Sequence, residues 1–251
     1  MTTTRIEASV NKTRAASVPA STSGDQSEGR GSTPSAALQV SPKNLQVRVI
    51  AAQVARVLFE RFHYLHSMPG GTVLCFGVFA KENLYGALSL GVGPKNAHMM
   101  VDGANPTDCL TLTRLWLEDI LPRNSESMVI GLVIHALRQH TKIKFLISYA
   151  DPAEGHLGTI YQATNWLYTG ISDAQPKLDL GDGIPRHLRS VGSAFGTHSG
   201  KYFREHGLDV KFVPQSGKHR YIYFIDPSCR DRLRVPTMPY PKKGGNESGS
   251  A

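Results

Sequence analysis

Short apolar segments with the period of a β-strand alternate, between residues 45 and 171, with segments that have the period of an α-helix. We expect strands at 45–50, 72–80, 84–90, 110–117, 144–150 and 166–171, and helices at 51–62, 126–140 and 158–165. The short link Lys81-Glu82-Asn83 predicts a hairpin between the second and third strands. This order predicts an α/β fold with a mixed, mostly antiparallel central sheet flanked by helices.

The two longer helices are both expected to pack on the sheet. The helix at 51–62 places Val54, Val57, Leu58 and Phe62 on one face, and we expect that face to be buried. The helix at 126–140 is strongly apolar. The order of elements is also that of the GNAT acyltransferase core, although several folds share it.

Composition divides the chain into a core and two tails. Residues 1–40 are rich in Ser, Thr, Ala and Gly and lack an apolar period, so we expect them to be disordered. Residues 241–251 give the same expectation. Between the tails we expect a GNAT-like catalytic core at 45–176 and a basic C-terminal part of the same domain at 177–240.

The net charge of +8 is concentrated in the last third of the chain. Residues 177–251 carry 13 basic and 7 acidic side chains, whereas residues 47–176 carry ten of each. A basic part joined to a neutral one is typical of a polyanion-binding surface. A solvated, weakly basic face explains the same numbers, so charge alone does not decide.

The cysteines and the apolar segments bear on the compartment. Cys75, Cys109 and Cys229 are odd in number and lack the spacing of a disulfide framework or a zinc site. No apolar run approaches the 18 or so residues of a membrane span, and no apolar secretory stretch follows the N-terminus. We therefore expect a cytoplasmic protein with no membrane segment.

The first candidate for chemistry is the segment from Phe62 to Ser67, at the end of the first expected helix. It contains His63 and Tyr64 and leads into a proline–glycine turn. His63 is a candidate general base near neutral pH. The alternative is a histidine that stabilises a helix C-terminus by its charge.

The second candidate is the junction before the helix at 126–140. There, backbone N–H groups and the side chains of Arg123, Asn124, Ser125 and Ser127 could bind a pyrophosphate. In a GNAT fold this junction holds the pyrophosphate of coenzyme A, but the usual glycine-rich loop is absent. Simple capping of the helix by Asn124 or Ser125 is the alternative.

The third candidate follows the strand at 144–150. Asp151 lies just past that strand, where α/β sheets place groups that handle ligands, and Tyr161 lies in the next short helix. Ordinary turn chemistry would explain Asp151-Pro152, and half-buried packing would explain Tyr161.

Taken together, these segments resemble the Mom family of phage DNA-modification proteins, from about residue 45 to 242. The matching stretches are Phe62-His63-Tyr64, Arg123-Asn124-Ser125-Glu126-Ser127, Ser148-Tyr149-Ala150-Asp151 with Tyr161, Lys218-His219-Arg220-Tyr221-Ile222-Tyr223 and Pro239-Tyr240-Pro241-Lys242. The resemblance implies a GNAT-like enzyme that converts adenine to N6-carbamoylmethyladenine and so protects phage DNA from host restriction.

The resemblance also implies roles for individual residues. His63, Tyr64, Asp151 and Tyr161 match the family's active-site positions, and Ser125 lies in its acetyl-CoA region. Relatives are also linked to bound iron, for which His63, Tyr64 and Asp151 could supply ligands. No histidine pair with metal-ligand spacing supports the iron.

The target chemistry makes further demands on the protein. The exocyclic amine of adenine is a poor nucleophile, so an enzyme must orient it, remove a proton and present an activated acyl donor. The base must be flipped out of double-stranded DNA or met in transiently single-stranded DNA. Candidate stacking surfaces are Tyr64, Tyr149, Tyr161 and Trp166. Candidate phosphate contacts are Arg186, Arg189, Lys201, Arg204, Lys218, Arg220, Arg230, Arg232 and Arg234.

Two other functions fit the same sequence. An N-acetyltransferase acting on a small amine or a protein would explain the fold and the acetyl-CoA junction but not the basic part. A non-catalytic DNA-binding protein on the same scaffold would bind DNA without affinity for acetyl-CoA. A homodimer is compatible with each function.

Overall fold

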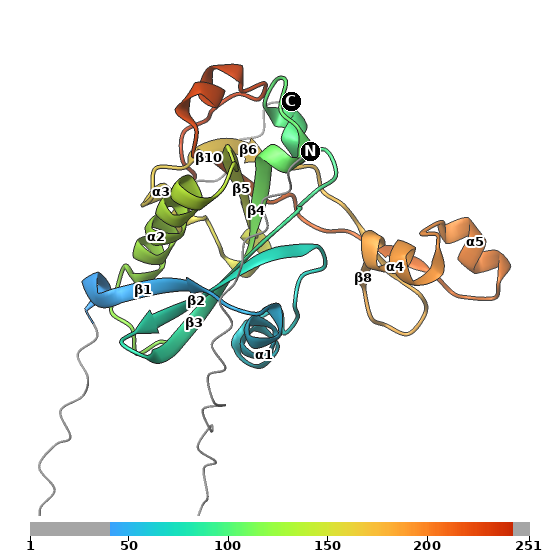
Figure 1. Ribbon diagram of the computed structural model, residues 1–251. Helices are drawn as coiled ribbons and strands as arrows, with labels where there is room; N and C mark the ends of the chain where they lie inside the picture. Colours follow the sequence, from blue (N-terminus) through green and yellow to red (C-terminus); the bar gives the residue numbers. More distant parts are fainter. Residues whose placement is uncertain (1–40, 243–251) are drawn as a thin grey trace, which may run out of the picture. The chain divides into compact units, whose positions relative to one another are not determined.

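The computed structural model describes residues 41–242 (Figure 1). The expected disorder of residues 1–40 lies outside this range, as does most of the second expected tail. Within it, no helix is long and apolar enough to cross a membrane.

A seven-stranded sheet forms the centre of the fold, in the order β1-β2-β3-β4-β5-β10-β6. Only β4 and β5 among these neighbours are parallel. The mixed, mostly antiparallel sheet predicted from the sequence is therefore confirmed. The strands are β1 Leu45–Val49, β2 Thr72–Ala80, β3 Asn83–Gly91, β4 Cys109–Leu117, β5 Phe145–Ala150, β6 Leu167–Ile171 and β10 His219–Phe224.

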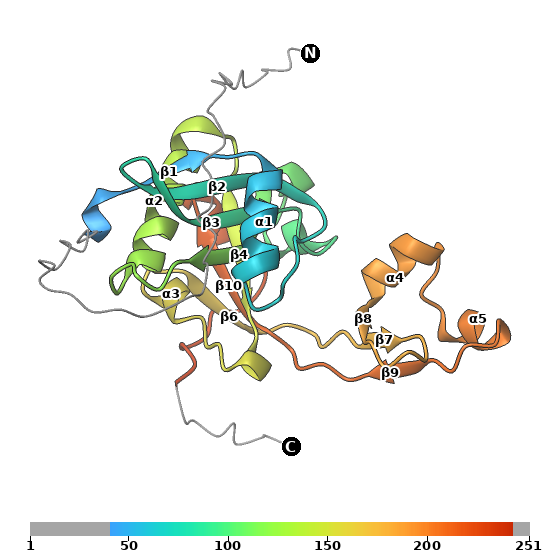
Figure 2. The same ribbon diagram turned by 90° about the horizontal axis from the view of Figure 1, so that it is seen from below.

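The two longer helices pack on opposite faces of the sheet (Figures 1 and 2). Helix α2 (Ser125–His140) buries a stripe of branched side chains against Leu88 of β3, while α1 (Ala52–Phe62) packs on the neighbouring Ala87. Leu88 and Ala87 point to opposite faces because successive side chains of a strand alternate. Both helices agree closely with the predicted bounds.

The predicted buried face of α1 is wrong for three of its four residues. Ala55 and Phe59 are fully buried and Leu58 packs beside them, whereas Val54, Val57 and Phe62 are exposed. The small side chain of Ala55 lets the helix approach Cys75 and Ala87 closely, and Phe59 fills the remaining space. Phe62 instead stacks on Trp116, with ring centroids 4.7 Å apart.

Strand β10 lies between β5 and β6, although it follows β6 by 47 residues in the sequence. It pairs antiparallel with both neighbours, Tyr221 lying opposite Ser148 on one side and Tyr168 on the other. The sheet therefore needs a strand from beyond the predicted core boundary at residue 176. The sequence analysis assigned no strand there.

Residues 177–213, between β6 and β10, form a smaller unit that we call the inserted lobe (Figure 2). Its three-stranded sheet has the order β8-β7-β9, and its own apolar core contains Leu178, Val191, Phe203 and Val210. The elements are β7 Lys177–Asp179, β8 Arg186–His187, α4 Leu188–Phe195, α5 Gly200–Glu205 and β9 Lys211–Val213.

The two parallel strands separate near their C-terminal ends. Pairing between β4 and β5 ends at Leu112 and Ser148, although β4 continues to Leu117 and β5 to Ala150. A register shift between β3 and β4 leaves Thr113 as an extra residue on β4 at this point, as in a β-bulge. Asp151 follows β5 directly, and the short helix α3 (Thr159–Gln162) comes next, so the third candidate segment borders this opening.

Candidate active site

His63 ends α1 and is almost completely buried. Its Nδ1 accepts a hydrogen bond from the backbone N–H of Leu65, 3.1 Å away, so the proton of the neutral ring is on Nε2. Burial, with a smaller effect of the charge of Arg114, lowers the pKa of His63 to about 4. His63 is therefore neutral near pH 7 and offers an N–H donor, which argues against the general-base role expected from the sequence.

Tyr64 lies beside His63, and its ring is exposed on one side. The two rings stack with centroids 4.4 Å apart, and Tyr64 also makes an edge contact with His156 at 5.3 Å. Burial raises the pKa of Tyr64, while the nearby charge of Arg114 acts to lower it and that of Asp151 to raise it. The structure therefore brings Tyr64 into electrostatic range of Asp151.

Asp151 is held in place by several donors. Its carboxylate accepts a hydrogen bond from the backbone N–H of Ala153 and a weaker one from the Ser216 hydroxyl, and it forms an ion pair with Lys218 at 2.9 Å. Burial acts to raise the pKa of Asp151, but the hydrogen bond and charge of Lys218 outweigh it, so the pKa is lowered. Asp151 is thus an oriented carboxylate at neutral pH.

Tyr161 lies in the core where β4 and β5 separate. The buried Ser148 hydroxyl oxygen lies 2.7 Å from the Tyr161 phenol oxygen and 3.1 Å from the Leu112 carbonyl oxygen, within hydrogen-bond distance of both. Burial raises the pKa of Tyr161 to about 12, and the hydrogen bond from Ser148 partly offsets this. Ser148 has one hydroxyl proton for these two neighbours and the Leu112 carbonyl can only accept, so the Ser148 hydroxyl and the phenol form a hydrogen-bonded chain that fixes the position of the phenol.

Arg114 is a site residue to which the sequence analysis gave no role. It belongs to β4, and its guanidinium carries no ion pair among residues 41–242. Its Nε is buried and has no hydrogen-bond partner there, while other guanidinium nitrogens contact the Thr113 carbonyl and the Ser67 hydroxyl. A charged residue within an apolar strand is the signal that could have identified it.

The structure thus joins the first and third candidate segments into one site. His63 and Tyr64 stack, the pKa of Tyr64 responds to the charge of Asp151, and the pKa of Tyr161 in turn responds to Tyr64. His156 is a second addition that sequence reasoning missed. The site combines a neutral imidazole N–H, a carboxylate, a protonated phenol and a half-buried guanidinium, a set suited to proton transfer and to stabilising negative charge.

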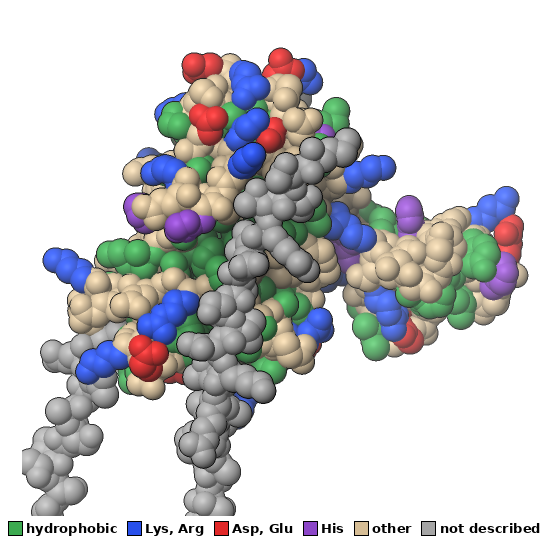
Figure 3. Space-filling view, in the orientation of Figure 1, with side chains coloured by type: hydrophobic (Ala, Val, Ile, Leu, Met, Phe, Trp, Pro, Cys, Tyr) green, Lys and Arg blue, Asp and Glu red, His purple; other side chains and the backbone are tan. Residues whose placement is uncertain are grey.

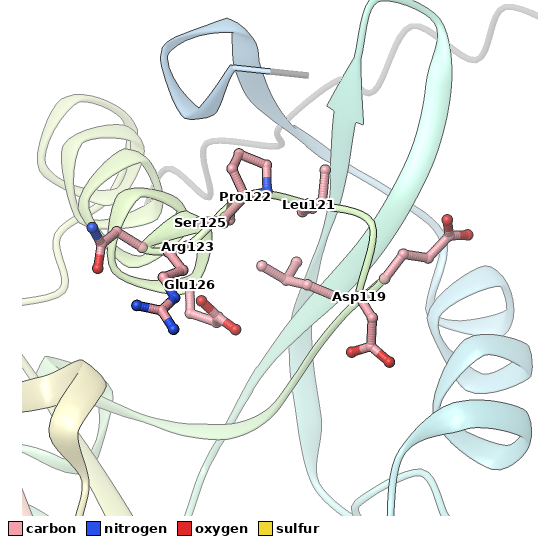
Figure 4. Close-up of a pocket in the computed structure, with 9 residues that line it drawn as sticks. Asp119, Leu121, Pro122, Arg123, Ser125 and Glu126 are labelled. Carbon is pink, nitrogen blue, oxygen red and sulfur yellow. Dashed lines mark hydrogen bonds between the residues drawn. The ribbon is translucent and has the colours of Figure 1, made fainter. Parts of the chain in front are cut away.

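The second candidate segment lines a separate cavity of about 470 Å³ at the start of α2 (Figure 4). The Ser125 hydroxyl, buried, donates to the Pro122 carbonyl at 2.7 Å, and the Ser127 hydroxyl donates to the Asn124 carbonyl at 2.9 Å. Both hydroxyl protons are therefore engaged with the backbone. Asn124 has a left-handed conformation (φ 69°) and makes no side-chain cap.

The remaining donors of this cavity fit a phosphate only in part. The backbone N–H groups of Glu126 and Ser127 have no acceptor among the described residues, and the Arg123 side chain is exposed. The carboxylates of Glu118, Asp119 and Glu126 also line the cavity and would repel an anion. Arg123 and the first turn of α2 therefore have donors available for an anion, whereas the serine hydroxyls donate to the backbone.

The expected iron receives no support from the described residues. Between residues 41 and 242 no group of three or more His, Cys, Asp or Glu side chains is arranged to hold a metal ion. Nδ1 of His63 is already an acceptor for Leu65, and Asp151 is paired with Lys218. We derive no step through a metal.

The other side chains predicted to contact DNA differ in burial and pairing. Of the four candidate stacking rings, Trp166 and Tyr161 are buried, Tyr149 is half-buried, and only Tyr64 is exposed. Lys218 pairs with Asp151 rather than being free for phosphate. Several of the other predicted cations are also engaged: Arg186 with Asp182, Lys201 with Glu205, Arg220 with Thr169, and Arg232 and Arg234 with Asp102. On the face seen in Figure 3, Lys and Arg are interspersed with Asp and Glu.

Fold and site together describe an α/β domain whose polar cluster borders the opening between two parallel strands. A model of the Mom protein family matches residues 44–242. The methylcarbamoylase mom of Escherichia phage Mu is 30% identical in an alignment of 207 residues that covers 80% of this chain and 85% of that protein. The chain belongs to the Mom protein family, as its sequence motifs predicted.

Solved structures with a related arrangement are acetyltransferases. A spermidine N-acetyltransferase from Vibrio cholerae, solved with CoA and spermine, is 8% identical, with a TM-score of 0.40 over 72% of this chain and 96% of that one. An N-acetyltransferase from Staphylococcus aureus Mu50 is 10% identical, with a TM-score of 0.40 over 72% and 97%. Likeness at this level carries no argument about substrate or cofactor.

Proposed function

We propose that this enzyme modifies adenine in phage DNA, by N6-carbamoylmethylation, and thereby protects that DNA from host restriction in the cytoplasm of the infected cell. Membership of the Mom family, with a relative named as a methylcarbamoylase, is the observation that carries the proposal. The cluster of His63, Tyr64, Asp151 and Tyr161 supports it, because its groups meet the chemical demands of an amine nucleophile.

Asp151 orients the exocyclic amine and accepts its proton. A carboxylate held by Lys218 and the Ala153 N–H has a fixed direction and an unused lone pair for an N–H donor. An amine bound in one orientation reacts faster than a free one because the entropy of alignment is already lost on binding. Removing its proton keeps the lone pair available for bond formation.

His63 and Tyr161 act as donors. The Nε2–H of His63 hydrogen-bonds to oxygen that gains negative charge, and the half-buried Arg114 guanidinium adds to this stabilisation. Tyr161, whose pKa of about 12 keeps it protonated, would give its proton to the CoA thiolate as that group leaves. Ser148 acts through Tyr161 as a positioning residue, because its hydroxyl fixes the phenol.

Arg123 and the N–H groups that begin α2 would hold the pyrophosphate of acetyl-CoA. When bound, acetyl-CoA would supply the two-carbon unit of the added group, and the amide nitrogen of a carbamoylmethyl product would come from a second, nitrogen-containing donor. The flipped adenine stacks on the exposed ring of Tyr64, which His63 and His156 support from within.

The test is a reaction with labelled acetyl-CoA in the presence and absence of double-stranded DNA. We expect label to enter DNA and none to enter small amines or protein. Label that enters amines equally well without DNA would support a plain N-acetyltransferase instead. DNA binding with no affinity for acetyl-CoA, measured by calorimetry, would support a non-catalytic protein.

A further inference from the structure

The inserted lobe is not needed to complete the central sheet. Strands β6 and β10 pair directly, with Tyr168 opposite Tyr221, so a short turn could join them. The chain instead forms a second small sheet with two helices and an apolar core around Phe203. An addition of this kind is typical of a unit that contacts a partner.

Three aromatic rings on the lobe remain exposed. Phe195 is 52% exposed, Tyr202 is 42% exposed and Phe212 is 47% exposed. Each contacts the lobe on one side: Phe195 packs edge-on against Phe203, and Tyr202 stacks on His206 at 4.1 Å. Solvent-exposed rings held from behind in this way are suited to stacking on another flat group.

On the lobe, cations without an ion pair outnumber carboxylates without one. The carboxylates of Asp182, Glu205 and Asp209 each form an ion pair within the lobe. The remaining carboxylate, that of Asp179, accepts backbone N–H groups of the turn that follows it. Lys177, Arg189 and Arg204 have no ion pair among the described residues.

One aromatic ring and one cation meet at Gly200. A Cβ built at this glycine would lie 2.9 Å from the Phe212 ring and 3.2 Å from the Arg204 guanidinium. A flat ring beside a guanidinium can contact a base and its phosphate together, and this combination marks proteins that bind single-stranded nucleic acid.

The lobe is joined to the core beside Asp151. The segment that returns from β9 to β10 contains Ser216, whose hydroxyl lies 3.4 Å from the Asp151 carboxylate, and Lys218, which pairs with it at 2.9 Å. The segment that joins the lobe to the core therefore contacts a residue of the candidate active site.

We propose that the inserted lobe binds unpaired nucleotides that flank the target adenine. Bases stack on Phe195, Tyr202 and Phe212, and phosphates contact Lys177, Arg189 and Arg204. The inference rests on the proposed function for the identity of the DNA substrate. It differs from a purely electrostatic DNA contact because the rings, rather than net charge, supply much of the affinity.

The test compares two triple variants of the full chain. In the ring variant, Phe195, Tyr202 and Phe212 each become Leu, which keeps apolar volume but removes the stacking surface. In the charge variant, Lys177, Arg189 and Arg204 each become Gln. The matched control is Ile184→Ala, because Ile184 is apolar, 57% exposed and on the same lobe. Thermal unfolding verifies that each variant is folded.

Fluorescence anisotropy with a single-stranded and a double-stranded oligonucleotide gives the readout. We expect the ring variant to bind the single strand with roughly tenfold or more weaker affinity, with its salt dependence unchanged. The charge variant should flatten the log–log salt slope by about 0.7 for each phosphate of the single strand that it no longer neutralises. Ile184→Ala should bind like the wild type.

A folded ring variant that binds single strands like the wild type would overturn the inference, as would an equal reduction of affinity in Ile184→Ala. If the ring variant binds weakly but the wild type modifies no adenine in cells, the lobe assignment stands and the proposed function fails. If the ring variant binds and modifies DNA normally, the proposed function stands and the lobe assignment fails.

Discussion

Replacing Ser148 by Ala removes one oxygen atom from the point where β4 and β5 separate. The side chain is fully buried, and its hydroxyl lies 2.7 Å from the Tyr161 phenol oxygen and 3.1 Å from the Leu112 carbonyl. Losing a buried donor while its acceptors remain costs about 1–3 kcal/mol of unfolding free energy. For a chain of this size that lowers Tm by roughly 2–12 °C.

The same substitution frees the Tyr161 phenol to move, and a displacement on the order of 1 Å in a catalytic group lowers the rate by about 10²-fold. The larger change, Tyr161→Phe, removes the proton donor and should lower kcat by about 10²–10⁴-fold. Because Ser148 is proposed to act only through Tyr161, the double variant should be as slow as Tyr161→Phe alone.

The assay is a double-mutant cycle on kcat and KM for DNA modification, with Ser148→Thr as the variant that retains a hydroxyl. We expect Ser148→Ala to lower kcat more than it raises KM, and Ser148→Thr to restore part of the rate. Effects that multiply in the double variant would refute the positioning role of Ser148. Normal activity in Tyr161→Phe would instead refute the role of Tyr161 itself.

Two other changes at the candidate active site, and two at the start of α2, have expected outcomes. Folding lowers the pKa of His63 to about 4, so the free energy of unfolding is highest above about pH 6.5 and decreases as pH falls from there toward 4. His63→Gln should flatten this part of a plot of Tm against pH. An unchanged slope would contradict the assignment. Arg123→Ala should weaken acetyl-CoA binding in calorimetry by about 1–3 kcal/mol, and equal affinity would move the pyrophosphate elsewhere. Ser125→Ala should instead lower Tm with little effect on that affinity, since its hydroxyl holds Pro122, and the reverse pattern would restore the predicted phosphate contact. Asp151→Asn should lower the rate by about 10²–10⁴-fold, with a small decrease in Tm from loss of the ion pair with Lys218, and a variant of near-normal rate would exclude Asp151 as the proton acceptor.

Much of the fold follows from local pattern. Apolar periods place α2 and the strands up to β6 close to their observed bounds, because each buries one face on one sheet. The position of β10 does not follow, since its pairing with β5 and β6 is set by contacts between residues far apart in the sequence. Apolar periodicity also does not reveal the buried face of α1. The small side chain of Ala55 allows close packing on the sheet, so Ala55 is buried while the larger Val57 is exposed.

The site was predictable as a set of segments but not as a set of roles. Motif order identified His63, Tyr64, Asp151 and Tyr161, and the structure brings the first two into a ring stack. The role of His63 depends on one backbone hydrogen bond from Leu65, which no sequence pattern reveals. In the same way, the sequence does not show that Ser125 and Lys218 are engaged. In the folded protein, Ser125 donates to the Pro122 carbonyl and Lys218 pairs with Asp151.

The central claim is that this chain modifies adenine in DNA through Asp151. The most direct measurement is mass spectrometry of nucleosides from the DNA of cells that express the wild type or Asp151→Asn at equal levels. We predict a modified adenine nucleoside in the first sample and its absence, or near absence, in the second. Unmodified adenine in DNA from cells with well-expressed, folded wild-type protein would contradict the account.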